Sequence, residues 1–231
     1  MSIFISDASN VRMKIHLPNT PKGICIIVSS GHMGSFDEQG VDGEQDLYSA
    51  LFSLLPQMGY GVVQPDMPLR DNINIPATSE HIVEREKRLN SCIDYVLSLG
   101  FEWGNIVLIG FSLGGQIILD TLTNPLSGAI LIGCVIDTEL RTKINSKVNI
   151  KLLYGSNDYI AYLDESGEVK PISPEVYQWN SIKFLKIAGA KNISSKIIKG
   201  YGHSLEKTEK SEDNLLEIIC MLINHIIILE S

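Results

Sequence analysis

The chain has 231 residues, enough for one large domain, and no change in composition marks a second, so we expect a single domain over residues 1–231. Its formal net charge is −8 and no stretch is strongly basic, which argues against nucleic acid or an anionic membrane as the principal partner. The four cysteines are far apart, so reduced thiols are expected and not a metal site. Without a basic, apolar leader at the N-terminus, a cytoplasmic location is expected.

Predicted strands and helices alternate along the chain. Two segments with alternating apolar residues, 2–6 and 11–17, predict an antiparallel pair. Continuous apolar runs of the kind found in central strands follow at residues 23–29, 61–64, 106–109, 129–133, 150–154 and 196–198. Helical patterns lie between them, at residues 44–58, 79–100, 115–123, 174–188 and 213–229. This alternation predicts an α/β fold with a mainly parallel sheet covered by helices on both faces.

Some helical segments carry further signals. Pro56 should kink or shorten the last turn of the helix at 44–58. Gly100 is a candidate C-cap, and the charge run at 84–88 is interpreted as a solvated helix face.

The apolar segment 215–229 is the one candidate for a membrane span. It is shorter than the roughly 20 apolar residues that a spanning helix needs, and it contains Glu217, Asn224 and His225. We therefore predict no membrane span and interpret the segment as a terminal helix packed on the sheet.

A nucleophile is indicated at residues 110–114, where an apolar run ends in Gly-x-Ser-x-Gly and a helical pattern follows. In that context the serine, Ser112, occupies a very sharp turn between strand and helix. A side chain at Gly110 or Gly114 would collide with the neighbouring strand or helix. The pattern alone is common, and a serine between glycines is often part of an ordinary turn.

A serine hydroxyl needs a base to take its proton and a third group to orient that base. His203 lies in a glycine-flanked loop after the strand at 196–198, and Asp158 follows the strand at 150–154. Either could be an ordinary loop or capping residue. The chain order Ser, Asp, His is one of the orders in which this triad occurs.

These residues give the chain its resemblance to the α/β-hydrolase superfamily, specifically to small serine esterases and thioesterases. The resemblance runs from Gly23 to the C-terminus and implies a sheet of about eight strands. It implies Ser112 as the nucleophile, His203 as the base and Asp158 as the acid. Because some members carry the acid one strand earlier, Asp137 stays open as an alternative.

An oxyanion hole must stabilise the charge that develops on the carbonyl oxygen. One backbone donor is expected at Leu113, directly after the nucleophile. For the other, the loop at 29–35 takes the place of the superfamily's His-Gly-x-Gly, which implies His32 or Met33. The sequence departs from that pattern because Ser30 stands where histidine is usual.

The expected reaction is hydrolysis of an ester or thioester through an acyl-enzyme, with no cofactor and no metal. Only residues 137–147 separate the sixth and seventh strands, so a large lid is not expected and small or carrier-linked acyl substrates are favoured. A hairpin at 159–173 is a candidate wall of the site. Side chains near the predicted rim could line the pocket or simply pack; they are Phe111, Tyr159, Tyr162 and Tyr201.

Other functions remain compatible with this sequence. An acyltransferase or a peptidase would use the same three residues with a different acceptor or substrate. A non-catalytic ligand-binding protein of the same fold is the alternative from another class, although its usual sign would be a missing triad member. The sequence does not indicate the oligomeric state.

Overall fold

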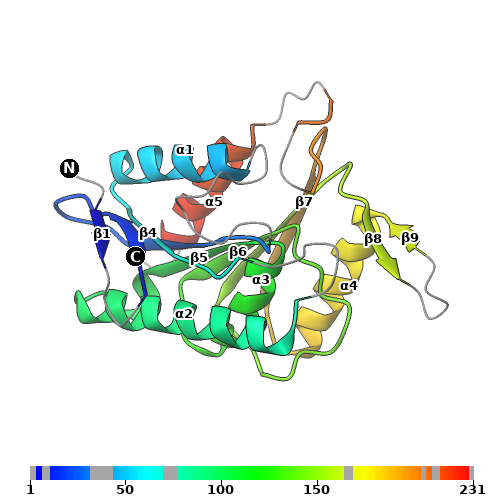
Figure 1. Ribbon diagram of the computed structural model, residues 1–231, viewed down its shortest axis with the longest axis horizontal. Helices are drawn as coiled ribbons and strands as arrows, with labels where there is room; N and C mark the ends of the chain where they lie inside the picture. The colour runs from blue at the N-terminus through cyan, green and yellow to red at the C-terminus, as the bar shows by residue number, and fades with distance from the viewer. Residues whose placement is uncertain are drawn as a thin grey trace.

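The computed structural model describes residues 4–6, 11–31, 44–69, 77–163, 169–203, 207–209 and 214–228. In this part of the chain, an eight-stranded sheet has helices on both faces, and a two-stranded hairpin stands beside it (Figure 1). The order of the strands in the sheet is β1-β2-β4-β3-β5-β6-β7-β10. The predicted α/β architecture is therefore confirmed.

Six neighbouring strands run parallel to one another, in the order β4, β3, β5, β6, β7 and β10, whereas β2 is antiparallel to both β1 and β4. The bounds are β1 (Phe4–Ser6), β2 (Met13–His16), β3 (Ile24–Val28), β4 (Gly61–Pro65), β5 (Ile106–Phe111), β6 (Gly128–Ile132), β7 (Asn149–Gly155) and β10 (Asn192–Ile198). The central strands β3, β5 and β6 are buried along their whole length, because helices cover both sides of the sheet.

The last strand is longer than its sequence pattern predicted. β10 begins at Asn192, four positions before the predicted apolar segment at 196–198. It forms the edge of the sheet, and its first, third and fifth residues are exposed. A continuous apolar run identifies a strand that is buried on both faces. The first residues of β10 alternate between exposed and partly buried positions, so a search for apolar runs did not find them.

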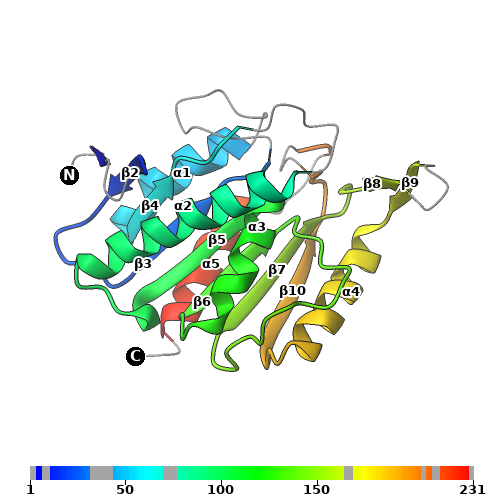
Figure 2. The ribbon, with the colours of Figure 1, turned by 60° about the horizontal axis from the view of Figure 1, so that its bottom comes forward.

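Helices α1 and α5 cover one face of the sheet, and α2, α3 and α4 cover the other, as Figures 1 and 2 show. Their bounds are α1 (Glu44–Gln57), α2 (Ser79–Ser98), α3 (Leu113–Ile118), α4 (Pro174–Ile187) and α5 (Leu215–Ile228). A 3₁₀ helix (Leu119–Thr123) continues α3. One apolar cluster lies between the sheet and the helices on each face. Successive side chains of β3 and β5 therefore pack alternately into one cluster and the other.

The hairpin consists of β8 (Ile160–Leu163) and β9 (Val169–Ile172), paired antiparallel. This agrees with the prediction of two extended pieces within residues 159–173. It extends from the end of β7 and leads directly into α4 (Figure 2).

The C-terminal helix packs on the sheet as the sequence predicted. Ile219, Ile223 and Ile226 of α5 are fully buried in the cluster that also contains α1. Among the described residues, no helix has the length and apolar character required to cross a membrane.

All four cysteines are buried and free. Burial raises the pKa of the Cys134 thiol to about 12. Burial, followed by the nearby Glu217 carboxylate, raises the pKa of Cys220 to about 11. These thiols are therefore protonated at neutral pH and poorly nucleophilic.

A proline and a glycine account for the C-terminal ends of α1 and α2. α1 includes Pro56 and ends one residue later, at Gln57, in agreement with a shortened last turn. Gly100 follows α2 with a φ of +92°, and its amide donates to Leu97 O at 3.0 Å. Glycine takes this conformation without strain, and a Cβ there would have no atom within 4 Å.

Gly100→Ala should therefore destabilise the fold through backbone strain alone, by about 1–2 kcal/mol. The measurement is urea unfolding of both proteins. Lys87→Ala, an exposed substitution in the same helix, should change stability by less than about 0.5 kcal/mol. Equal stability of Gly100→Ala and the unsubstituted protein would contradict the assignment of strain to this position.

Candidate active site

The turn between β5 and α3 is confined to one residue. Ser112 has a φ of 49° and a ψ of −116°, and it is the only non-glycine residue with positive φ in the described part of the chain. Its amide donates to Ile132 O on β6 at 2.8 Å, and its carbonyl accepts from Gly115 N at 2.9 Å. These bonds hold the strained conformation, and strain of this kind is often found at functional sites.

The two glycines of the motif are required by close packing of main chain against main chain. A Cβ on Gly110 would lie 2.7 Å from Gly115 Cα, and one on Gly114 would lie 2.6 Å from Ser29 O. Neither backbone can yield without moving α3 away from the sheet. The distances thus agree with the collision that the sequence motif predicted for a side chain at Gly110 or Gly114.

The structure brings Ser112, His203 and Asp158 together. The Ser112 Oγ lies 3.0 Å from His203 Nε2, and His203 Nδ1 lies 2.8 Å from Asp158 Oδ1. Asp158 is 1% exposed, whereas the His203 side chain is 27% exposed. With the buried carboxylate on Nδ1, the Nε2 that faces Ser112 Oγ can accept the serine proton.

Hydrogen bonds from main-chain N–H groups join the loops that carry the acid and the histidine. Asn157 N donates to Tyr201 O at 2.9 Å, and Gly200 N donates to Ser156 Oγ at 2.9 Å. β7 and β10 are neighbours in the sheet, so their following loops start side by side. Asp158 and His203 are therefore held together by the backbone as well as by their own contact.

The loop after β6 leaves room for this pair. Gly133 has a φ of +58°, and a Cβ there would lie 3.2 Å from both Cε1 and Nδ1 of His203 and 3.4 Å from Asp158 Oδ2. Asp137, the alternative acid, lies further along this loop and is exposed. The carboxylate that contacts the histidine is that of Asp158.

The other predicted site residues that the structure describes differ in their exposure to solvent. Leu113 is the first residue of α3, where backbone N–H groups lack partners within the helix. Phe111 is 2% exposed and packs edge to face on Tyr48, with ring centroids 4.8 Å apart. Tyr201 is buried and Tyr159 is exposed.

Two of the predicted site residues lie outside the described part of the chain, and a third is described only in its backbone. His32 and Met33 lie outside the described residues. Tyr162 lies in β8, but its side chain is outside the description.

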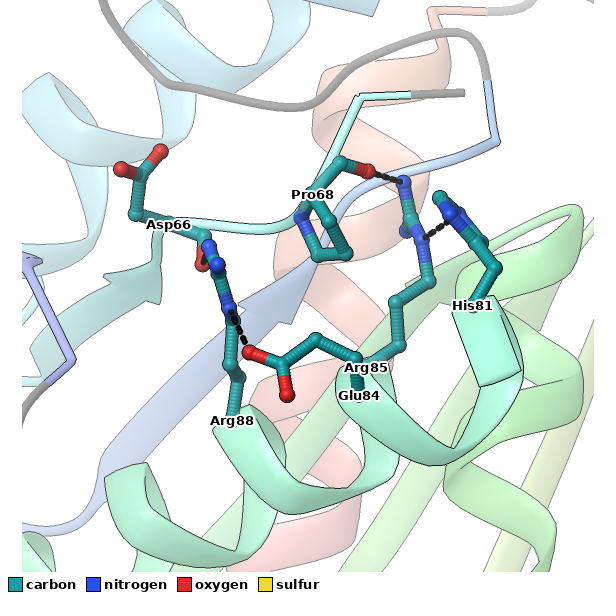
Figure 3. Close-up of polar contacts among 6 residues, drawn as sticks. All are labelled: Asp66, Pro68, His81, Glu84, Arg85 and Arg88. Carbon is teal, nitrogen blue, oxygen red and sulfur yellow. Dashed lines mark hydrogen bonds and ion pairs between the residues drawn. The ribbon is translucent and has the colours of Figure 1, made fainter. Parts of the chain in front are cut away.

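Sequence reasoning missed Arg85. The interpretation of residues 84–88 as a solvated face is wrong for this residue, which is fully buried. Its guanidinium donates to Ser29 O and Ser30 O at 3.0 Å each, and to Pro68 O at 3.1 Å. Its Nε donates to His81 Nε2 at 2.9 Å (Figure 3).

A sequence signal for this burial exists. Arg85 lies four residues before Leu89 and therefore continues the apolar stripe of α2, which includes Cys92, Ile93 and Val96. Arg88, one turn later, instead bonds Glu84 Oε1 at 2.9 Å and Asp66 O at 2.8 Å and is partly exposed (Figure 3).

Two surface hollows in the described part of the chain lie elsewhere. One, of about 450 Å³, is lined by Pro18, Lys22 and Asn105, before β3 and β5 begin. The other, of about 780 Å³, is lined by Trp103, Pro125 and Lys147. Ser112, Asp158 and His203 follow the carboxyl ends of their strands, so both hollows are at the opposite edge of the sheet.

No cluster of three or more potential metal-ligating side chains (His, Cys, Asp or Glu) is found among the described residues.

Solved structures share this fold over nearly the whole chain. A serine hydrolase without a lid from Xanthomonas campestris is 14% identical, with 98% of this chain and 93% of that chain covered and a TM-score of 0.61. A Bacillus cereus carboxylesterase is 16% identical, with 94% and 95% covered and a TM-score of 0.64. An α/β-hydrolase enzyme from a deep-sea metagenome library is 14% identical, with 98% of each chain covered and a TM-score of 0.62.

The class is therefore that of the α/β-hydrolase fold, and at these identities the structural likeness speaks for the fold alone. No curated protein matches the sequence significantly. Residues 66–212 match the phospholipase/carboxylesterase family, which is more than half of the chain. The chain belongs to the phospholipase/carboxylesterase family.

Gly133→Ala should slow the reaction of Ser112 with a fluorophosphonate probe by roughly tenfold, because the added methyl group would push the His203 ring out of line. The measurement is the second-order labelling rate of folded protein. Gly100→Ala is the matched control, since it also replaces a glycine with positive φ but lies far from the serine. Equal labelling rates in the two variants would contradict the tight packing inferred at Gly133.

Proposed function

We propose that this chain hydrolyses carboxylic esters or thioesters through an acyl-enzyme on Ser112. The observation that carries the proposal is the continuous contact from Ser112 Oγ through the His203 ring to the buried Asp158 carboxylate. Membership in the phospholipase/carboxylesterase family supports the same class of reaction.

In the first half of the reaction, His203 Nε2 takes the proton of Ser112 as the oxygen attacks the carbonyl carbon. Asp158 accepts a hydrogen bond from Nδ1, orients the ring and stabilises its positive charge. The tetrahedral intermediate then collapses, and the bond to the leaving group breaks. His203 returns the proton to the departing alcohol or thiol, and the acyl group stays on Ser112.

In the second half, His203 Nε2 takes a proton from water, and the resulting hydroxide attacks the acyl carbonyl. The bond between the acyl carbon and Ser112 Oγ breaks, and the serine oxygen recovers its proton from His203. The products are a free acid and the original enzyme.

The oxyanion of each intermediate needs donors that are already in position. We assign one to the amide of Leu113, the first of α3, because it directly follows the nucleophile. The second donor is proposed in the loop that follows β3, where His32 and Met33 are the candidates.

Substrate size follows from what surrounds the triad. Residues 133–148, which connect β6 to β7, contain no helix, so this connection supplies no helical lid. The β8–β9 hairpin stands to one side, and Tyr159 at its base is 59% exposed (Figure 2). We therefore propose a small acyl group, free or attached to a larger carrier, as the substrate.

Replacement of the three residues should separate their roles. Ser112→Ala and His203→Ala should each lower kcat for p-nitrophenyl acetate by a factor of at least roughly 1,000. Asp158→Asn should lower it by a similar factor, because the amide favours the wrong tautomer of the imidazole.

Asp137→Asn is the matched control and should leave the rate within about twofold, since an exposed carboxylate makes little contribution. A large loss in Asp137→Asn with an active Asp158→Asn would reverse the assignment of the acid. A folded wild-type protein that neither hydrolyses the ester nor reacts with a fluorophosphonate probe would favour a binding protein.

The kcat/KM for p-nitrophenyl esters should be highest for short acyl chains of about two to six carbons, because a shallow site gains little apolar contact from additional methylenes. The measurement is a series from acetate to palmitate below the micellar concentration. A steep rise toward palmitate would contradict the open site proposed here.

A further inference from the structure

Arg85 is a buried cation close to the proposed site. It lies in the second turn of α2 and is the largest fully buried side chain in the described part of the chain. Burial of a guanidinium is costly unless hydrogen bonds satisfy its donors. Its position between two loops therefore needs a reason beyond packing.

The guanidinium joins two loops that are remote in sequence. Ser29 O and Ser30 O belong to the loop after β3, and Pro68 O belongs to the loop after β4. His81 Nε2, one turn earlier on α2, accepts from Nε and fixes the plane of the fork (Figure 3). Hydrogen bonds from a charged donor are stronger than those between neutral groups.

These contacts set the direction of two peptide groups. In a trans peptide the N–H points away from the C=O. Since the carbonyls of Ser29 and Ser30 point to Arg85, the amides of Ser30 and Gly31 point to the other side. The loop after β3 thus leaves the sheet with its peptide planes already oriented, immediately before His32 and Met33.

The same loop touches the turn that carries the nucleophile. Ser29 O accepts from Arg85 and would lie only 2.6 Å from a Cβ on Gly114, two residues after Ser112. The Ser29 carbonyl oxygen therefore lies close to both α3 and the guanidinium of Arg85.

We infer that Arg85 is a positioning residue, which fixes the Ser29 and Ser30 peptides beside the turn that carries Ser112 and thereby supports the stabilisation of the oxyanion formed there. This inference rests on the function proposed above. Arg85 touches neither the substrate nor the reacting atoms in this role; it acts through the two peptide groups that it holds.

The ammonium group of lysine is a compact charge and not a planar guanidinium, so it cannot donate to the same three carbonyls in the same geometry. Arg85→Lys should therefore lower kcat for p-nitrophenyl acetate by roughly 10- to 100-fold, with KM changed by less than about twofold. Affinity for a trifluoromethyl ketone, which forms the tetrahedral adduct on the serine, should fall by a similar factor.

Arg88→Lys is the matched control. Arg88 lies one turn further along α2 and also donates to a main-chain carbonyl, that of Asp66, but within the described part of the chain it makes no hydrogen bond to residues 29–31. Its replacement should leave kcat and the affinity for the ketone within about twofold. Circular dichroism and thermal unfolding are measured on both variants, so that assays run well below each Tm.

Three results would overturn the inference. One is an Arg85→Lys variant that is folded and has the kcat of Arg88→Lys. Another is a loss that falls on KM alone, which would indicate a role in substrate binding. The third is a wild-type protein without esterase activity or serine labelling, which would also overturn the proposed function; an active wild type with an unaffected Arg85→Lys would overturn only the positioning role.

If Arg85→Lys does not fold, His81→Phe tests the same role at a partly exposed position. Loss of the Nε2 acceptor should allow the guanidinium to rotate, with a fall in kcat of about threefold or more and an unchanged KM. A His81→Phe variant with wild-type kcat and wild-type affinity for the ketone would then overturn the inference.

Discussion

The sharp bend of the backbone at Ser112 is the constraint on which the rest of the site depends. A helix follows a buried parallel strand after a single residue, and that residue must adopt a φ of 49°. The bend is possible only because Gly110 and Gly114 let main chain approach main chain. It lifts the hydroxyl above the carboxyl edge of the sheet while α3 stays packed on β5 and β3.

The partners of Ser112 are held by the order of the strands. β5, β6, β7 and β10 are successive neighbours, so the loops that follow them emerge along the same edge. Open α/β sheets place their functional residues at this edge for that reason. Hydrogen bonds between the loops after β7 and β10 then bring the carboxylate of Asp158 to the ring of His203. A methyl group on Gly133 would crowd both residues.

The two sides of the site are held by different means. After β7 and β10, main-chain groups bond to each other and to Ser156. After β3 and β4, the guanidinium of Arg85 bonds carbonyls from both loops. A planar fork with five donors can reach several carbonyls at once, which explains how one side chain connects segments that have no strand pairing at this point. The buried charge of α2 thus contacts the Ser29 and Ser30 carbonyls, close to the turn that carries Ser112.

Sequence alone determined the central strands, the helices between them and the likeness of the 110–114 motif to a nucleophile turn. It did so because a strand buried on both faces appears as an apolar run and because a sharp bend requires glycines at set positions. It also indicated Asp158 and His203 by their order along the chain. Tertiary structure alone decided which carboxylate contacts the histidine, where the exposed half of β10 begins, and which carbonyls surround the guanidinium of Arg85. Those features depend on neighbours remote in the chain: an edge strand is half in water, and a charge beside other charges looks solvated until distant carbonyls surround it.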